Sequence, residues 1–526
     1  MRSWRGWLAL LVCLLPLAPQ VLLWMPDAQG QAATGSDLAG SGFDGSGFDG
    51  SALAASILVA AAAAALALLI GASLAALLSL TDFPLPAVWA TMALLPFICP
   101  PTVWTLGQMY CYGPGGVMER VLGDDWRPML SRANTGHYLA TVVVLAEVHV
   151  PLVMLIVGRG FERLHQAGFE SARFYLSRRR LFAWMLTAAR RELIGAYLLA
   201  FALGIGNFAV PHVLQCRLYV IEVYMRLTNY LDVAGAVRAA GMLLLVAMTA
   251  GLLAWCGEGG VRGSAADVSR RWRMPLGRAR WPLLVLVAGY FAVTTWLPLA
   301  AIACECQSFA LFFEAVREAA PETANSLRLG FGAVLLACGL GLLVATLVGR
   351  HARRSPVDAV VTATLGVPSL LIGLAMSRLA YRTWPVDLSI LGASSLLVTM
   401  GLAARGWPFA ARLLINGRRA AAPAWYEAAT LGGLRGWRRW RWLDGPLFAS
   451  DLGAAALLVF VLAIGEVEIS QLLCPPGGGT LALRLFTYLH FGPTHVTASL
   501  AMLQLLLAVV PVFVYFVLAN RVLRLV

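Results

Sequence analysis

Apolar runs of about twenty residues follow one another along almost the whole chain. A transmembrane helix needs about 20 consecutive apolar residues. Of the 526 residues, 60% are hydrophobic and only 13% are charged, which excludes an ordinary soluble domain. We therefore expect an all-α integral membrane protein in a lipid bilayer, with about twelve transmembrane helices. The runs lie at residues 1–24, 52–80, 86–110, 137–157, 194–214, 233–256, 281–303, 324–348, 356–376, 388–404, 448–473 and 496–519.

The basic residues indicate how the chain is oriented. All 40 of them are Arg, and the net charge is +13. The arginines cluster in short loops between apolar runs, which is typical of cytoplasmic loops. The charge therefore does not indicate a nucleic-acid partner. It predicts a multi-pass protein with both termini in the cytoplasm.

The first run has two interpretations. Arg2 and Arg5 precede an apolar core, as in a signal peptide, but the same pattern suits an uncleaved first span. We expect an uncleaved span, because the later spans need a cytoplasmic N-terminus. Residues 25–51 repeat the motif SGFDG and contain no Arg, so they suit a flexible external loop.

The most informative stretch is 416–447, NGRRAAAPAWYEAATLGGLRGWRRWRWLDGPL, which lies between two apolar runs and is rich in arginine. Residues Ala424 to Leu431 are good helix formers, with Pro423 suited to the first turn. Gly432 and Gly433 end that helix and permit a sharp turn. The Trp and Arg residues that follow suit a second helix at the membrane surface. The stretch therefore predicts two short helices joined by a glycine corner.

Within this stretch, Glu427-Ala428-Ala429, Gly433 and Pro446 have a characteristic spacing. The pattern resembles the EAA loop of the membrane subunits of binding-protein-dependent ABC importers. The resemblance implies a short cytoplasmic coupling helix that docks on a separate ABC ATPase subunit, which acts as a dimer. It also implies an external solute-binding protein and a location in the bacterial inner membrane.

A weaker copy of the loop lies in the first half of the chain. Glu170-Ser171-Ala172 precedes Glu427-Ala428-Ala429 by 257 positions, and Leu176 stands where the copy should have its glycine. An internal repeat of this period is typical of two transporter halves. We expect two tandem six-helix halves, each with a coupling helix. The predicted domains are a first half at 1–256 with its core at about 55–255, a basic linker at 257–280, and a second half at 281–526 with its core at about 324–520.

In such permeases, the span after each coupling loop lines the central pathway. The resemblance therefore implies pathway residues Asn207 and Pro211 after the first loop, and Glu466 and Glu468 after the second. Two carboxylates near a pathway mouth attract a cation. The alternative is that they pair with Arg484 or accept hydrogen bonds from loop amides.

The likeness extends to one subfamily. The segment from Glu466 through Pro475-Pro476-Gly477 resembles ferric-iron importer permeases, and the segment around Pro211 also resembles putrescine and thiamine permeases. Ferric iron is therefore the expected solute. Thiamine, putrescine or spermidine, or another small solute are the alternatives. The chain itself is expected to be no enzyme and to hold no cofactor or metal.

A transporter of another class fits part of the pattern. Glu147 and His149 lie inside the apolar run at 137–157, where ionisable side chains are costly and usually face a bundle interior or a cavity. In a secondary transporter they would form the coupling-ion site. Packing against a neighbouring helix explains them equally well, and we keep both as pathway candidates.

The absence of lysine gives the first prediction. A P-loop needs a Gly-Lys-Ser or Gly-Lys-Thr lysine to reach the phosphates of ATP, and this chain has no lysine. The purified chain alone is therefore expected neither to bind nor to hydrolyse ATP. Nucleotide binding and phosphate release by the isolated chain test this, and stoichiometric hydrolysis would contradict it.

Overall fold

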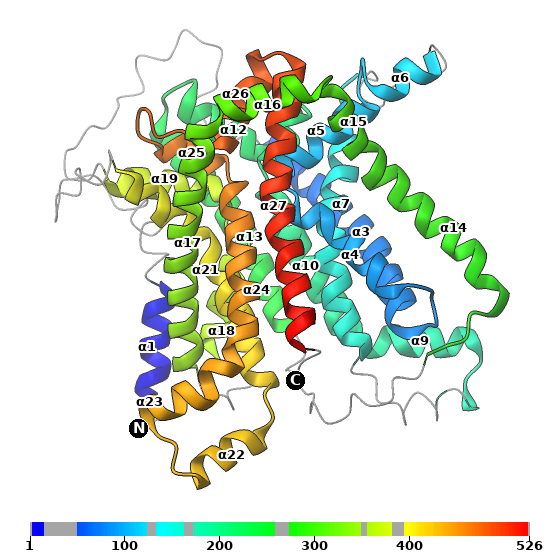
Figure 1. Cartoon of the computed structure of the whole chain (residues 1–526), viewed down its shortest axis with the longest axis vertical. Helices are drawn as coiled ribbons and strands as arrows, with labels where there is room; N and C mark the ends of the chain where they lie inside the picture. Colours follow the sequence, from blue (N-terminus) through cyan, green and yellow to red (C-terminus); the bar gives the residue numbers. More distant parts are fainter. Residues whose placement is uncertain are drawn as a thin grey trace.

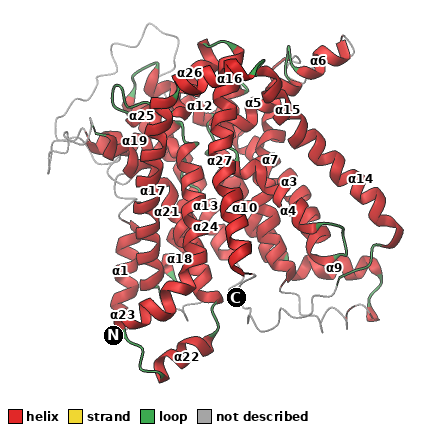
Figure 2. Cartoon of the chain, in the orientation of Figure 1, coloured by secondary structure: helices red, strands yellow, loops and turns green. Residues whose placement is uncertain are grey.

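The computed structural model describes residues 3–14, 50–123, 133–162, 172, 174–257, 273–348, 355–380 and 394–523. These residues form helices joined by turns, with one isolated β-bridge between Thr81 and Met274 and no strand among them (Figures 1 and 2). The all-α expectation is confirmed.

The helices divide between the two halves of the sequence. In the first half they are α1 (Ser3–Leu14), α3 (Gly50–Leu80), α4 (Pro86–Ile98), α5 (Pro101–Tyr112), α6 (Val117–Leu122), α7 (Ala133–Glu162), α9 (Arg178–Ala188), α10 (Arg190–Ile205), α11 (Ala209–Val213), α12 (Tyr219–Thr228) and α13 (Val233–Gly257). In the second half they are η5 (Gly277–Ala279), α14 (Arg280–Phe291), η6 (Ala292–Trp296), α15 (Leu297–Glu305), α16 (Phe309–Glu318), α17 (Ala320–Leu347), α18 (Pro356–Leu365), α19 (Ser369–Ala380), α21 (Ser395–Ala420), α22 (Pro423–Leu431), α23 (Gly436–Arg439), η7 (Trp440–Asp444), α24 (Gly445–Ile464), α25 (Glu468–Leu473), α26 (Leu481–Phe491) and α27 (Thr494–Leu523).

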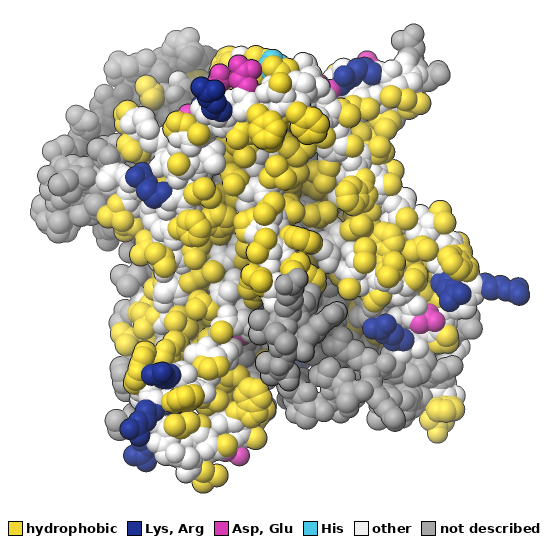
Figure 3. Space-filling view, viewed as in Figure 1, with side chains coloured by type: hydrophobic (Ala, Val, Ile, Leu, Met, Phe, Trp, Pro, Cys, Tyr) yellow, Lys and Arg dark blue, Asp and Glu magenta, His cyan; other side chains and the backbone are white. Residues whose placement is uncertain are grey.

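Seven of the described helical segments are long and apolar enough to cross a membrane. Two further pairs qualify only as bent spans: α4 with the α5–α6 segment meets at 102°, and α18 with α19 meets at 101°. The described residues therefore contain seven to nine candidate spans, and the expected total of about twelve stays a prediction. Hydrophobic side chains cover most of the described middle of the face in Figure 3. The chain is a multi-pass membrane protein.

Four expected spans are broken or shifted, and a fifth, the run at 388–404, lies in the longer helix α21, which begins at Ser395 and continues to Ala420. The runs at 86–110 and 356–376 are broken in the middle rather than straight. The run at 194–214 is helical only to Ile205 and resumes as the short α11. The run expected at 448–473 begins earlier, because α23, η7 and α24 are continuous from Gly436, and it ends at Ile464. Glycine and proline interrupt each of these apolar runs, and hydropathy alone does not register them.

Each half packs its first helix on the other half. α1 lies against α17 and α18, and Ala9, Val12 and Cys13 join the apolar core of the second half (Figure 1). α14 lies against the first half, where Val287 and Phe291 join the core formed by α3, α4 and α7. The predicted domain limits stay a prediction, but the two halves exchange their first helices.

The π-helical turn η6 explains how α14 continues into α15. A π-helical turn leaves carbonyl groups without their usual partner four residues on. Two side chains of α5 donate to these groups: Gln108 Nε2 to the carbonyl of Thr294 at 2.9 Å, and Tyr112 Oη to that of Val293 at 2.6 Å. α5 therefore holds the helix of the other half in place.

The closest helix contacts use small residues, as membrane helices do. A Cβ added to Gly71 of α3 would lie 2.9 Å from the carbonyl oxygen of Val150 in α7. At the corresponding place in the second half, a Cβ on Gly341 of α17 would lie 2.9 Å from the backbone nitrogen of Ala411 in α21. Each glycine lets two long helices meet backbone to backbone.

This contact gives a test within one helix. Gly341→Ala places a methyl group against the backbone of α21, and we expect a loss of about 1–3 kcal/mol of stability from overpacking. Gly339 on the same helix has no atom within 4 Å of an added Cβ. Gly339→Ala should instead gain about 0.4–1 kcal/mol. Thermal unfolding in detergent measures both, and equal midpoints for the two variants would contradict the packing assignment.

Candidate functional site

Four helix breaks meet at one pocket in the middle of the molecule. They lie at 99–100 between α4 and α5, at 206–208 between α10 and α11, at 366–368 between α18 and α19, and at 465–467 between α24 and α25. The pocket has a volume of about 100 Å³. Its lining comprises Phe97, Ile98, Cys99, Pro100, Pro101, Leu203, Gly206, Asn207, Ala209, Gly366, Val367, Pro368, Ser369, Arg405, Val461, Leu462, Gly465, Glu466, Val467 and Glu468.

The breaks are arranged in two matching pairs. A Cβ on Gly465 would lie 2.9 Å from Cβ of Pro100, and a Cβ on Gly206 would lie 2.7 Å from Cγ of Pro368. In each pair a proline of one half sits against a glycine of the other half. Glycine is needed here because any larger residue would push the proline away. The pocket therefore lies on the pseudo-symmetric contact between the halves.

The two carboxylates of the pocket have different environments. Glu466 Oε2 accepts a hydrogen bond from Ser369 Oγ at 3.1 Å, and the backbone N–H groups of Glu468 and Ile469 face its carboxylate. Glu468 is only 8% exposed, and the backbone N–H groups of Leu370 and Phe208 face its carboxylate. Its Oε2 is buried and has no hydrogen-bond partner in the described structure. A buried polar atom without a partner is costly, so this oxygen is available to a ligand.

Arg405 of α21 lines the same pocket. Its Nη1 donates to the carbonyl oxygens of Leu365 at 3.1 Å and Val367 at 3.2 Å. These carbonyls lie at the end of α18, where the break leaves them without helical partners. Arg405 thus stabilises the broken backbone and adds one positive charge beside two acids. Two carboxylates and one guanidinium therefore line the same pocket.

The structure does not support pairing of the pocket acids with Arg484. Arg484 lies in α26 and pairs instead with Glu322 at 2.9 Å and Glu318 at 3.5 Å. The alternative of hydrogen bonds from loop amides is supported, because backbone N–H groups face both Glu466 and Glu468. Glu466 and Glu468 therefore lie in the pocket rather than in a surface ion pair.

The other pathway candidates lie in different places. Asn207 lines the pocket and its Oδ1 accepts from the backbone N–H of Val210 at 3.0 Å, which caps α11. Pro211 is buried in α11 and is not a lining residue. Across the described ranges, no group of three or more His, Cys, Asp or Glu side chains could hold a metal ion.

Glu147 and His149 of α7 lie outside the pocket. Glu147 Oε2 accepts from Trp104 Nε1 at 3.0 Å and from Gln108 Nε2 at 2.7 Å, both on α5. His149 Nδ1 lies 2.6 Å from the carbonyl oxygen of Leu145 in its own helix. Gln108 also holds the π-helical turn that follows α14, so Glu147 belongs to a network that joins α5, α7 and α14. This geometry favours the packing interpretation of both residues over an ion site.

The second loop forms the expected corner. α22 covers Pro423–Leu431, and Gly433 has φ 71°. The backbone N–H of Leu434 donates to Ala429 at 2.9 Å, and that of Gly433 donates to Thr430 at 3.2 Å. These two bonds define a Schellman motif, in which glycine takes the left-handed position without steric cost. The sequence prediction of a helix closed by Gly432-Gly433 is confirmed.

α22 projects from one end of the bundle and is exposed (Figure 1). Glu427 and Ala428 are exposed and Ala429 is buried. Two large apolar side chains are exposed on the same helix, Trp425 at 54% and Leu431 at 89%. The guanidinium of Arg439 lies 5.1 Å from the ring centroid of Tyr426, which ties α22 to the helix that follows. α22 thus presents a fixed apolar knob with one acidic residue.

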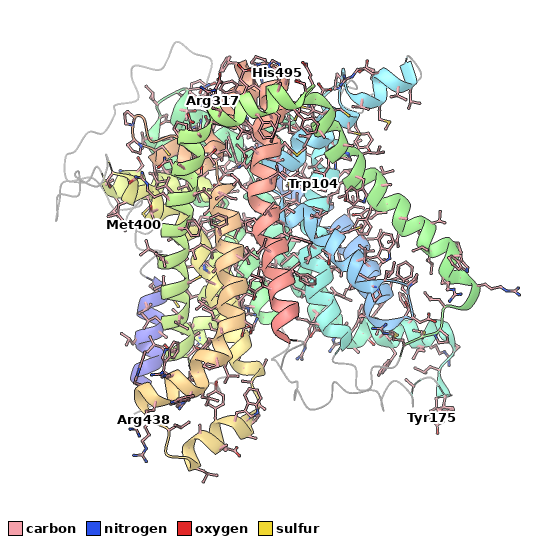
Figure 4. The ribbon with its side chains drawn as sticks, in the orientation of Figure 1. Trp104, Tyr175, Arg317, Met400, Arg438 and His495 are labelled. Atoms are coloured by element: carbon pink, nitrogen blue, oxygen red, sulfur yellow. The ribbon has the colours of Figure 1, made fainter. Side chains whose placement is uncertain are left out.

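The first loop lies at the same end of the molecule, since Figure 4 labels its Tyr175 and Arg438 of α23 both at the lower end of the view. Glu170 and Ser171 lie outside the described residues, whereas Ala172 is helical and partly buried. Leu176 packs with Leu181 and Met185 of α9. At the position where the second loop has Gly433, Leu176 therefore fills a small apolar core. Phe174 and Tyr175 are each 87% exposed and form the apolar tip of this loop.

Sequence reasoning missed four residues of the pocket. Arg405 directly follows an expected span and belongs to no motif. Ser369, Pro100 and Gly206 lie inside runs that are expected to be continuous spans. The signal that finds them is the pairing of Cys99-Pro100-Pro101 with Gly366-Val367-Pro368 at matching positions of the two halves, since interrupted segments in corresponding places point to a transporter's binding site.

Comparison with known proteins supports one family. No family model matches the chain. The chain is similar to the thiamine transport system permease protein ThiP of Brucella abortus and Brucella suis, with 26% identity over 448 residues in each case. The ThiP protein of Brucella melitensis is 26% identical over 447 residues. Each alignment covers 78% of this chain and 76% of the relative. The similarity supports a permease of a binding-protein-dependent ABC importer.

The corner at Gly433 gives a test of the loop. Gly433→Val forces a β-branched residue into the left-handed region, at a cost of about 1–2 kcal/mol, although an added Cβ meets no atom within 4 Å. We expect co-purification of an ABC ATPase subunit, the partner that the sequence predicts, to fall about 5- to 30-fold. Gly433→Asn is the matched control, because asparagine tolerates this conformation. The docking role of the corner is wrong if both variants retain the ATPase equally.

Proposed function

We propose that this chain is the complete pathway of an ABC importer, with both permease halves fused, and that it carries thiamine or another small organic cation. The observation that supports the solute class is the pocket, whose lining contains Glu466, Arg405 and Glu468 with its unpartnered Oε2. The relatives' own names add thiamine to this class. Thiamine carries a permanent positive charge. Ferric iron, the solute expected from the sequence, has less support, because the relatives carry another name.

The architecture suggests how the pathway works. A pocket of about 100 Å³ is smaller than the roughly 300–1,000 Å³ of small-molecule sites. The solute therefore needs the halves to separate around the four breaks. Rocking of one half against the other opens the pocket alternately to the two sides. The paired proline and glycine contacts are the surfaces that part.

The projecting loops suggest where the ATPase subunits dock. We assign α22 and the loop at 172–176 to docking of two copies of an ABC ATPase subunit, which makes their end of the bundle cytoplasmic. Glu427, Ala428, Ala429 and Gly433 form the second docking site, with Glu170, Ser171 and Ala172 in the first. ATP hydrolysis then belongs to the partner and transport to this chain. An external binding protein delivers the solute to the opposite end, and the protein lies in the bacterial inner membrane.

The direct test of function is uptake of labelled solute. Cells that express the chain with its ATPase subunit and binding protein are expected to accumulate labelled thiamine, and unlabelled putrescine or ferric citrate is expected to compete poorly. Accumulation of ferric iron without thiamine would instead support the solute expected from the sequence. Uptake that persists without the ATPase subunit would contradict the importer assignment.

The carboxylates of the pocket give a sharper prediction. Glu468→Gln keeps the shape of the side chain but removes its charge, so we expect thiamine uptake to fall at least tenfold, or about 1.4 kcal/mol. Glu318→Gln is the matched control, because Glu318 is a half-exposed carboxylate of α16 outside the pocket. Both variants are expected to co-purify with the ATPase. Normal uptake by Glu468→Gln would contradict the proposal that the pocket lies on the pathway of the cation.

A further inference from the structure

Asp358 is a buried carboxylate that the transport proposal does not use. It lies in the first turn of α18 and is 2% exposed. Arg419 of α21 binds it through two nitrogens, Nη1 to Oδ1 at 3.0 Å and Nη2 to Oδ2 at 2.8 Å. Arg412, also of α21, approaches Oδ1 at 3.7 Å. A bidentate pair of this kind is geometrically specific, so it fixes one end of α18 to α21.

The other end of α18 is fixed to the same helix. Arg405 of α21 donates to the carbonyl oxygens of Leu365 and Val367, where α18 ends at the pocket. Two arginines, fourteen residues apart on α21, therefore hold α18 at both ends. Only three residues separate Arg419 from Pro423, the first residue of α22. We call the contacts of Arg405 and Arg419 with α18 the clamp. The clamp joins the coupling loop directly to the pocket wall.

α18 also reaches into the first half of the chain. A Cβ on Gly251 of α13 would lie 2.8 Å from Cα of Ala363 in α18. A Cβ on Gly366 would lie 3.0 Å from Ala202 of α10 and 3.2 Å from the carbonyl oxygen of Ala247 in α13. Contacts this close transmit displacement, because packed backbones cannot compress. α18 therefore connects the second coupling loop to helices α10 and α13 of the first half.

The first half has no charged clamp on α4, its own broken helix. α4 corresponds to α18 and contains no charged residue. The position of Asp358 is taken by apolar sequence around Trp89, whose Nε1 donates to the carbonyl of Pro84 at 3.0 Å and whose ring stacks on Phe291 at 5.8 Å. α4 is thus held to α14 by apolar contacts. Of these two corresponding helices, only α18 carries the charged clamp.

From these contacts we infer that the Asp358–Arg419 pair is the positioning contact that transmits movement of the second coupling loop through α18 to the pocket and to the first half. The inference rests on the proposed importer function. The first loop, with Leu176 packed in a local core, has no such clamp on its broken helix. The two ATPase docking sites are consequently unequal, and the second drives the opening of the pocket.

The test compares two neighbouring arginines in the complete complex of this chain with its ATPase subunit and binding protein. Arg419→Gln removes the bidentate pair, while Arg412 keeps a positive charge near Asp358 so that the carboxylate is not left unpaired. Arg418→Gln is the matched control, since Arg418 donates to the carbonyls of Ala345 and Val348 at the end of α17, which does not line the pocket. Arg419→Lys restores the positive charge but cannot form the bidentate pair with the carboxylate.

The measured quantities are basal ATPase activity, its stimulation by solute-loaded binding protein, and uptake in proteoliposomes. We expect Arg419→Gln to keep assembly and basal hydrolysis, and to lose at least fivefold in stimulation and in solute carried per ATP. Arg419→Lys should recover part of both, and Arg418→Gln should match the wild type. Equal loss in the two glutamine variants, or full stimulation of Arg419→Gln, would overturn the inference. A wild-type chain that binds no ATPase would instead overturn the proposed function.

A further variant keeps the inference testable if Arg419→Gln does not fold. Asp358→Leu with Arg412→Leu and Arg419→Leu replaces the buried carboxylate and both arginines that approach it by apolar side chains, an exchange that buried ion clusters often tolerate. This triple variant is expected to assemble and to remain uncoupled, because apolar contacts lack the directional bidentate pair. Full solute-stimulated hydrolysis in the assembled triple variant would show that packing alone transmits the movement, and would also overturn the inference.

Discussion

The structure depends on one constraint: within a bilayer, every backbone N–H and C=O group needs a partner inside the protein. Four helices break at the depth of the pocket, and each break leaves backbone groups that lipid cannot satisfy. The break after α18 is covered by Arg405, and the break after α10 is capped by Asn207. The pocket is therefore both the place where helices break and the place where polar side chains gather.

The features that can be predicted from the sequence are those that depend on residues close together in the chain. The corner of the second loop was predictable in detail, because Pro423, Glu427 and Gly433 act through local backbone preferences. The helical class was equally accessible, because span length follows from bilayer thickness. The solute stays a prediction, because ferric iron was expected from a resemblance in sequence and the relatives carry the name of thiamine permeases.

The pocket was predictable only in part. Glu466, Glu468 and Asn207 were expected in the pathway and do line the pocket, although their role stays a prediction. The alternative that Glu466 and Glu468 pair with Arg484 is not supported, because Arg484 pairs with Glu318 and Glu322, and the partners of a buried acid depend on helices distant in sequence. The exchange of α1 and α14 was also inaccessible, because an apolar helix without a polar mark does not reveal which neighbour it packs on.

That exchange bears on how the protein is made. The helices that α1 packs on, α17 and α18, follow it in the chain by roughly 300 residues. At roughly 5–20 residues per second, synthesis of this interval takes about 15–60 s. The face of α1 that contacts the second half has no partner from that half until α17 and α18 have been made. This contact between the halves can therefore form only late in synthesis.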